Sequence, residues 1–108
     1  MMNRNDWQGV MPAITTPFDS KLTVDEVFLR SHVSWLVDAG CTGIVTPGSL
    51  GEGATLSLDE KRTIWRACVE SVGSRVPIVA AIAAAGTREA VELAKEAEHC
   101  GCRGLMVL

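Results

Sequence analysis

Residues 43–57 are Gly-Ile-Val-Thr-Pro-Gly-Ser-Leu-Gly-Glu-Gly-Ala-Thr-Leu-Ser: a short apolar run, a glycine-rich stretch and a serine. Because residues 43–47 show no polar alternation, they are typical of a strand that is buried on both faces. Glycine-rich residues 48–53 favour a loop. Ser57 and Glu60 have the spacing of a capping box, and apolar residues continue at helical spacing up to Gly73. The stretch therefore predicts a strand, a loop and a helix in that order.

The same order recurs on both sides of this stretch. Upstream, the apolar run 10–15 predicts a strand, and Thr23 with Glu26 predicts a capped helix that ends at Gly40. Downstream, residues 77–83 predict a strand, and Thr87 is expected to cap a helix that ends at Gly101. Residues 104–108 predict a last strand.

Buried strands that alternate with amphipathic helices indicate an α/β fold with a parallel sheet. The segment 40–44, Gly-Cys-Thr-Gly-Ile, is echoed by Gly-Cys-Arg-Gly-Leu at 101–105, 61 residues later. This separation fits two strand-helix units of roughly 30 residues each. A (β/α)₈ barrel takes about 250 residues, so residues 1–108 are expected to supply about three and a half of its eight units. We expect an amino-terminal part of one barrel domain, with residues 104–108 as an unprotected sheet edge.

The composition excludes several classes of protein. The chain has 47% hydrophobic and 21% charged residues, which is typical of a globular protein. Its net charge is −3, and no block of basic residues is long enough to bind along the phosphate backbone of a nucleic acid. The longest apolar run, 76–85, is shorter than the about 20 residues that cross a bilayer. The polar start lacks the pattern of a secretory signal, and three of the four cysteines lie in or beside apolar segments. These features predict a cytoplasmic protein with free thiols and no membrane partner.

The glycine-rich loop is the candidate binding site. In a barrel it lies at the carboxyl ends of the strands, where active sites are found. Gly48 and Gly51 let the backbone approach a ligand, the amides between them can point at an anion, and Ser49 adds a hydroxyl. The loop would suit a small carboxylate. An ordinary glycine turn explains residues 48–52 equally well. Residues 15–18, Thr-Thr-Pro-Phe, end the upstream run at the same edge, where the hydroxyls of Thr15 and Thr16 either line the pocket or serve the turn.

The run 43–57, together with Met-Pro-Ala-Ile-Thr-Thr-Pro-Phe at 11–18, resembles the dihydrodipicolinate synthase / N-acetylneuraminate lyase family, and the similarity extends over all 108 residues. The resemblance implies a (β/α)₈ class I aldolase in which a lysine on a later strand forms a Schiff base with pyruvate. By the same resemblance, the loop holds the pyruvate carboxylate through Gly48, Ser49 and the Leu50 amide, and Ser49 joins a proton relay with tyrosines. It further implies no metal or organic cofactor, and assembly into dimers or tetramers.

Two positions depart from the family pattern. Family members usually carry Thr at both middle loop positions, or Ser followed by Thr, whereas this chain has Leu50. Leucine cannot bond a carboxylate through its side chain, so a different second substrate is expected. Residues 83–86, Ala-Ala-Ala-Gly, replace a more polar loop that contributes to subunit contacts and the rim of the site in the family.

The catalytic lysine and the relay tyrosines are expected beyond Leu108. The chain has no tyrosine, and Lys21, Lys61 and Lys95 fall in a loop or on helices rather than at strand ends. Since a Schiff-base amine needs desolvation to lower its pKa, none of the three is a candidate.

Other ionisable residues favour structural interpretations. Glu52 precedes a helix, where a carboxylate usually complements the dipole or loop amides rather than acting as a base. His32 shares a helical stripe with aromatic residues and is expected to pack or cap. Residues 99–102, His-Cys-Gly-Cys, lack a second ligand pair at zinc spacing.

The sequence thus predicts part of a Schiff-base-forming, pyruvate-dependent lyase that condenses or cleaves pyruvate, or another 2-oxo acid, with an aldehyde. One alternative is a sugar-acid dehydratase or another aldolase of the same family. The other is a non-catalytic truncated chain that only binds or assembles.

Overall fold

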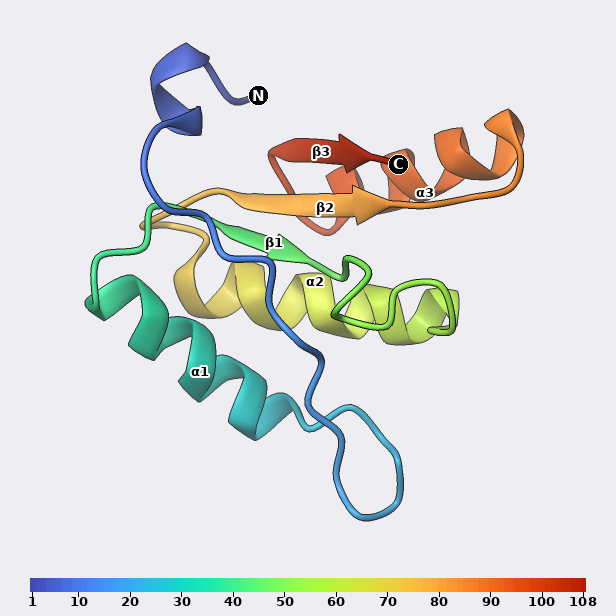
Figure 1. Cartoon of the computed structure of the whole chain (residues 1–108), viewed down its shortest axis with the longest axis horizontal. Helices are drawn as coiled ribbons and strands as arrows, with labels where there is room; N and C mark the ends of the chain where they lie inside the picture. Colours follow the sequence, from blue (N-terminus) through green and yellow to red (C-terminus); the bar gives the residue numbers. More distant parts are fainter.

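The computed structural model describes all 108 residues and contains one parallel sheet with helices packed on one side (Figure 1). The strands are β1 (Ile44–Thr46), β2 (Ile78–Ile82) and β3 (Gly104–Val107), in the order β1-β2-β3. The α-helices are α1 (Glu26–Asp38), α2 (Leu58–Val72) and α3 (Thr87–His99), and a short 3₁₀ helix, η1 (Arg4–Trp7), precedes them. Strand and helix alternate as the sequence predicts.

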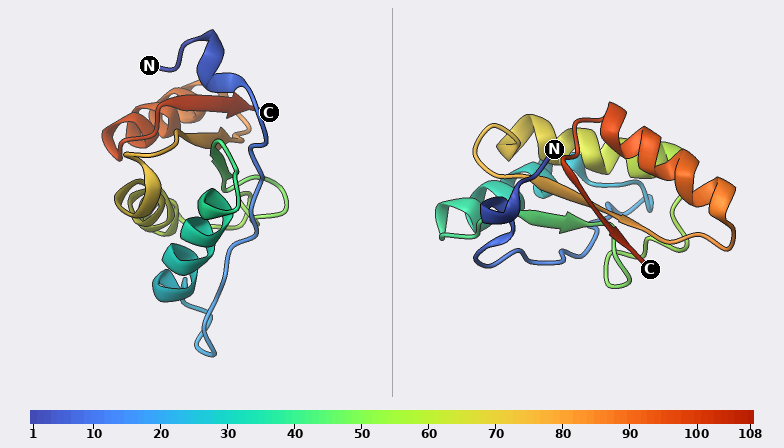
Figure 2. Two further views of the ribbon diagram at one scale, coloured as in Figure 1. Left: turned by 90° about the vertical axis from the view of Figure 1, so that its left-hand side faces the viewer. Right: turned by 90° about the horizontal axis from the view of Figure 1, so that it is seen from above.

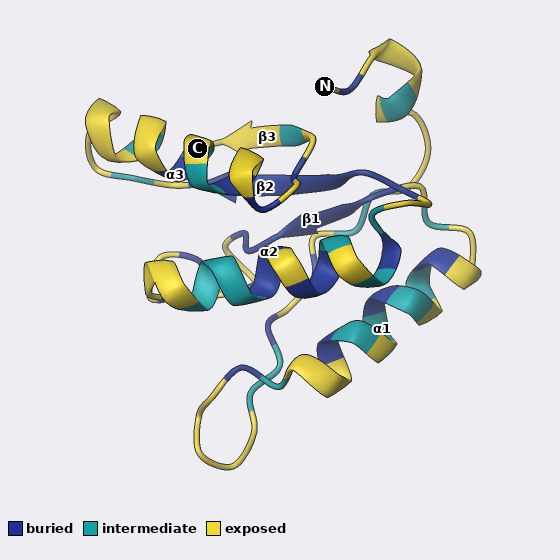
Figure 3. Cartoon of the chain, turned by 180° about the vertical axis from the view of Figure 1, so that it is seen from behind, coloured by how far each residue is buried: buried dark blue, intermediate teal, exposed yellow.

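The two faces of the sheet contact different parts of the chain. Ile44, Ile78 and Ile82 belong to the main core, which the helices cover, whereas Val45 and Val79 belong to a small cluster on the opposite face. Adjacent residues of a strand point to opposite faces, so this division follows from the period of two. The buried surfaces of β1, β2 and the inner sides of the helices are coloured dark blue in Figure 3.

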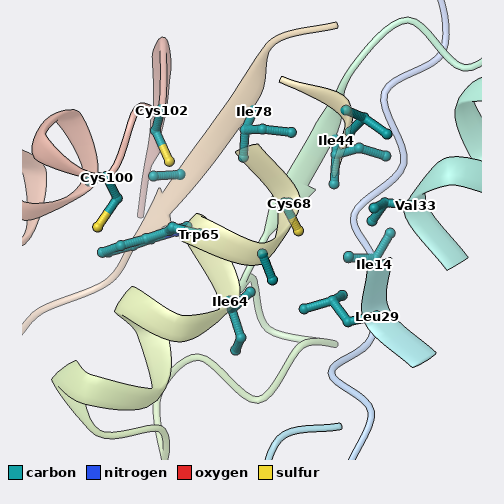
Figure 4. Packing of buried hydrophobic residues seen from close by; sticks show 14 of the residues in the cluster. Ile14, Leu29, Val33, Ile44, Ile64, Trp65, Cys68, Ile78, Cys100 and Cys102 are labelled. Carbon is teal, nitrogen blue, oxygen red and sulfur yellow. The ribbon is translucent and has the colours of Figure 1, made fainter. Parts of the chain in front are cut away.

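Helix α2 lies at the centre of the main core. Trp65 and Cys68 are fully buried and point in different directions: Trp65 lies beside Cys100 and Cys102, whereas Cys68 lies on the side of Ile44 (Figure 4). Burial of an aromatic side chain of this size contributes on the order of 2–3 kcal/mol to stability. Helix α2 contacts both α1 and α3 as well as strands β1 and β2, which places it at the centre of the helical layer.

The prediction of a buried strand at residues 10–15 is wrong, because the structure has no regular strand there. Only Ala13 forms an isolated parallel bridge, opposite Val45, and the segment is joined to β1 by a few backbone hydrogen bonds such as Ile14 N–H to Val45 C=O at 3.1 Å. Pro12 has no N–H to donate, and β1 pairs on its other side with β2. The segment thus runs beside β1 without becoming a regular strand.

Two of the predicted helix caps are also wrong. The Asp25 carboxylate caps α1 by accepting from the Phe28 amide at 3.0 Å, whereas the backbone amide and carbonyl of Thr23 are used in the preceding loop by Asp19. Helix α3 begins after Gly86 without a side-chain cap, and Thr87 is its first residue. The capping box of Ser57 and Glu60 at the start of α2 is confirmed, with both bonds formed.

The helix ends and the sheet edge match the predictions. Gly40 and Gly101 follow α1 and α3 with φ of 108° and 99°, the left-handed conformation that glycine adopts without strain. Strand β3 pairs only with β2, and Leu105, Met106 and Val107 remain exposed at the edge. None of the helices is both long enough and apolar enough to cross a bilayer.

Candidate functional site

The glycine-rich loop leaves the carboxyl end of β1, at the edge where the parallel strands all end. Two features of Thr46, the last residue of β1, define the point where the loop begins. Its carbonyl accepts from the indole N–H of Trp65 at 3.0 Å, which ties the end of the strand to α2. Its hydroxyl is fully buried and has no hydrogen-bond partner.

The loop is held closed by its own backbone. The Gly53 amide donates to the Gly48 carbonyl at 3.0 Å, and the Glu52 amide donates to the Ser49 carbonyl at 3.2 Å. Glu52 adopts φ of 62°, and a Cβ on Gly53 would collide with the carbonyl oxygen of Pro47. The chain therefore turns sharply at residues 49–53, and Gly53 is required by space.

The segment 14–16 contacts the loop at Gly51. The Thr16 hydroxyl is buried and donates to the Gly51 carbonyl at 2.6 Å. A Cβ on Gly51 would lie 3.0 Å from the carbonyl oxygen of Ile14, so the two backbones are in close contact. The sequence drew attention to Thr15, but the residue that fastens the loop is Thr16. The sequence predicts hydroxyls of the segment 15–18 at this edge, but no local pattern predicts the bond from Thr16 to Gly51.

The structure places the four predicted site residues on adjoining segments. Ser49 and Leu50 are exposed at the tip of the loop, and Gly48 is buried beneath them with room at its Cβ position, 3.9 Å from the nearest atom on Ala81. Thr15 is exposed on the supporting segment, next to Thr16.

The donor groups at the tip have no hydrogen-bond partner within the chain. The amides of Ser49 and Leu50 donate to no acceptor within the chain, and neither does the Ser49 hydroxyl. Consecutive unpaired amides of this kind form a site for an anion. Ser49 and Leu50 are both exposed, so the tip of the loop faces solvent.

Glu52 contributes to the loop mainly through its backbone. Its carbonyl accepts from the hydroxyl and the amide of Thr55, at 3.1 and 3.0 Å, and its carboxylate makes no hydrogen bond. The expected contact between this carboxylate and the loop amides is therefore not formed, and Glu52 takes part in the turn through its backbone alone.

The remaining reactive residues lie away from the loop. Lys21 lies in the turn before α1, while Lys61 and Lys95 lie on α2 and α3. All four cysteines are free thiols. Burial raises the pKa of Cys68 and of Cys102 to about 12, so both thiols stay protonated near neutral pH.

The model of the dihydrodipicolinate synthetase family matches residues 6–108. The chain belongs to this family. It is 37% identical over 108 residues to an uncharacterized DapA-like lyase of Rhizobium meliloti, covering 100% of this chain and 36% of the relative. It is 41% identical over 101 residues to a 4-hydroxy-tetrahydrodipicolinate synthase of Bartonella tribocorum, covering 94% and 34%.

Solved structures of the family agree with the fold. A dihydrodipicolinate synthase is 37% identical with a TM-score of 0.88, covering 94% of this chain and 35% of that structure. An N-acetylneuraminate lyase from Mycoplasma synoviae is 28% identical with a TM-score of 0.87, covering 97% and 36%. YagE from Escherichia coli K12, solved in complex with pyruvate, is 29% identical with a TM-score of 0.87, covering 94% and 34%.

The chain thus spans about a third of the length of these relatives. Their fold is the (β/α)₈ barrel, and this chain has the structure of its first strand-helix units. The relatives named above include an uncharacterized DapA-like lyase and an N-acetylneuraminate lyase.

Proposed function

We propose that this chain carries the carboxylate-binding part of a pyruvate-dependent lyase that works through a Schiff base. The observation that carries the proposal is the pair of unpaired amides at Ser49 and Leu50, held at the carboxyl end of β1 by the bond from Thr16 to Gly51. A carboxylate accepts strongly from backbone amides in such a turn, and the Ser49 hydroxyl can add a third bond.

The reaction requires an amine that this part of the barrel does not supply. In the proposed mechanism a lysine beyond residue 108 condenses with the pyruvate carbonyl and releases water. Loss of a proton from the methyl group gives a nucleophilic enamine, whose carbon then bonds to the aldehyde carbon. Hydrolysis finally frees the product and the lysine. The loop holds the carboxylate throughout, and Ser49 passes protons to tyrosines on later strands.

Leu50 favours a second substrate other than that of dihydrodipicolinate synthase proper. Its side chain is 72% exposed at the tip of the loop and offers no hydrogen bond. A sugar-acid dehydratase or another aldolase of the family is therefore the second candidate function. Another aldolase would join the bound 2-oxo acid to a different aldehyde, and a dehydratase would eliminate water from a single sugar acid.

We also propose that the whole protein is a cytoplasmic homo-oligomer, either a dimer or a tetramer. The free thiols support a reducing compartment. Size-exclusion chromatography with light scattering tests the assembly, and a monomer would contradict it.

The function is tested with a polypeptide that joins residues 1–108 to the remaining barrel units. We expect turnover of pyruvate with an aldehyde, and we expect Ser49→Ala to lower it by at least tenfold. Pyruvate with aspartate semialdehyde tests for a synthase. With a 2-oxo sugar acid, release of pyruvate indicates an aldolase, and loss of water without release of pyruvate indicates a dehydratase. If neither substrate class reacts and borohydride traps no pyruvate adduct, the chain only binds or assembles.

A further inference from the structure

The first eleven residues lie at the amino-terminal ends of the strands, on the side of the sheet opposite α2 and α3 (Figure 2, left). The Met2 amide donates to the carbonyl of Arg103, which directly precedes β3, at 3.3 Å. The Arg103 guanidinium pairs with Asp6 in η1 at 3.4 Å. Thr42, two residues before β1, donates its hydroxyl to the Gln8 carbonyl at 2.8 Å. Both ends of the segment are thus joined to strand starts.

Side chains of this segment cover the face of the sheet that the helices leave free. Met2 is buried in one cluster with Val45, Val79 and Ala81, and Met11 packs against the same cluster. In a (β/α)₈ barrel the helices form the outer ring, so the face opposite them lines the interior. Residues 1–11 therefore occupy the amino-terminal end of the barrel interior.

The two Gly-x-x-Gly segments, at residues 40–43 and 101–104, make room for the side chains of residues 1–11. The first glycine of each, Gly40 and Gly101, has a positive φ and ends a helix. The second glycines, Gly43 and Gly104, do not have a positive φ, so backbone conformation does not require them.

Space requires these second glycines. A Cβ on Gly104 would lie 2.5 Å from Sδ of Met2 and 3.0 Å from the ring of Trp7. A Cβ on Gly43 would collide with the end of the Met11 side chain. Each glycine at the start of a strand therefore receives a side chain from the amino-terminal segment.

We propose that residues 1–11 form a plug that closes the amino-terminal end of the barrel interior, and that Gly43 and Gly104 are the positions that receive it. With this end filled, the interior opens only at the carboxyl ends of the strands, where the loop of Ser49 lies. The plug depends on packing alone and is independent of the proposed chemistry.

The proposal is tested by a larger side chain at Gly104, in the space that Met2 and Trp7 occupy. Gly104→Val puts methyl groups into the space of Met2 and Trp7, so the segment should detach. Trypsin should then cleave after Arg4 at least tenfold faster, as followed by intact mass. The matched control is Leu105→Val, on the opposite face of the same strand, which should leave the rate of cleavage unchanged. Equal cleavage of the Gly104→Val chain and the parent chain would overturn the proposal.

A second measurement separates release of the plug from general damage to β3. Gly104→Val should lower the midpoint of thermal unfolding by about 4–8 °C, the shift of roughly 1 kcal/mol in a domain of this size. In a chain that carries Met2→Ala and Trp7→Ala, the same valine has room, and the shift should disappear. A shift of the same size in both chains would show that the valine acts on the strand and would contradict the plug.

Discussion

Thr46 has a buried side-chain hydroxyl that is left without a hydrogen bond. It lies at the end of β1, where the candidate site begins. Thr16, on the neighbouring segment, has a buried hydroxyl that is bonded to Gly51 at 2.6 Å. The two threonines therefore allow the cost and the benefit of a buried hydroxyl to be compared within one site.

We expect Thr46→Val to raise the free energy of unfolding by about 1 kcal/mol, because it replaces an unpaired polar group by a methyl group of the same shape. Thr16→Val is the matched variant and should lower it by about 1–3 kcal/mol, since it leaves the Gly51 carbonyl without its donor. Urea unfolding followed by circular dichroism measures both. A loss of stability in Thr46→Val would mean that its hydroxyl has a partner.

The proposed carboxylate site has no side-chain donor at Leu50. In a polypeptide with the remaining barrel units, Leu50→Thr adds one neutral donor. We expect it to tighten pyruvate binding, but by no more than about tenfold, or roughly 1.4 kcal/mol. Val27→Thr, on the exposed side of α1, is the control and should change nothing. Unchanged affinity in Leu50→Thr would show that this side chain points away from the ligand.

At the scale of single residues, the sequence could predict the tip of the loop but not its support. Gly48, Ser49 and Leu50 are adjacent, and their composition indicates an exposed turn. Thr16 bonds to a residue 35 positions away, and no local pattern records such a contact. The same limit applies to Gly104, whose neighbours Met2 and Trp7 come from the other end of the chain.

Among the secondary-structure elements, α2 and α3 differ in how they begin. At the start of α2, the Ser57 hydroxyl accepts from the Glu60 amide at 3.1 Å. Helix α3 begins after Gly86, and no side chain caps it with a hydrogen bond. Ser57→Ala should lower the free energy of unfolding by about 1 kcal/mol. Thr87→Ala, in the first turn of α3, should not lower it, because alanine is the better helix former and no cap is lost. Equal losses in the two variants, measured by urea unfolding, would contradict this assignment of caps.

Periodicity was sufficient to predict the three helices and the three paired strands, because burial of one face imposes a regular spacing. It failed at residues 10–15, where the apolar run is that of a strand but Pro12 interrupts donation to the sheet. It also failed at Thr23, since Asp25 competes for the same helix start and its carboxylate reaches the Phe28 amide. Short capping patterns overlap, and only the geometry selects among them.

For the molecule as a whole, the fold protects most of its thiols. Cys68, Cys100 and Cys102 are buried, whereas Cys41 is only half-buried. Because burial raises the pKa of Cys68 and Cys102 to about 12, the thiolate that reacts with iodoacetamide is scarce at pH 8. We expect one rapid label, on Cys41, in the native chain and four labels after denaturation. Rapid labelling of Cys68 or Cys102 would show that the core opens.

The arrangement of the whole chain also limits its chemistry. Its helices cover one face of a sheet that remains open at β3, and Lys21, Lys61 and Lys95 lie outside the strands. A Schiff-base amine must be kept uncharged by burial beside the bound 2-oxo acid, and none of these three lysines lies at the carboxyl end of a strand. We therefore propose that residues 1–108 bind the carboxylate and that the covalent step belongs to a later part of the barrel.

Reduction with borohydride in the presence of pyruvate tests which part of the barrel carries the reactive lysine. Intact mass should show the 108-residue chain unmodified, whereas a polypeptide extended through the remaining barrel units should gain one pyruvyl-derived adduct on a lysine beyond Leu108. The same extended polypeptide without pyruvate is the control and should keep its mass. Stoichiometric trapping on Lys21, Lys61 or Lys95 would contradict the account.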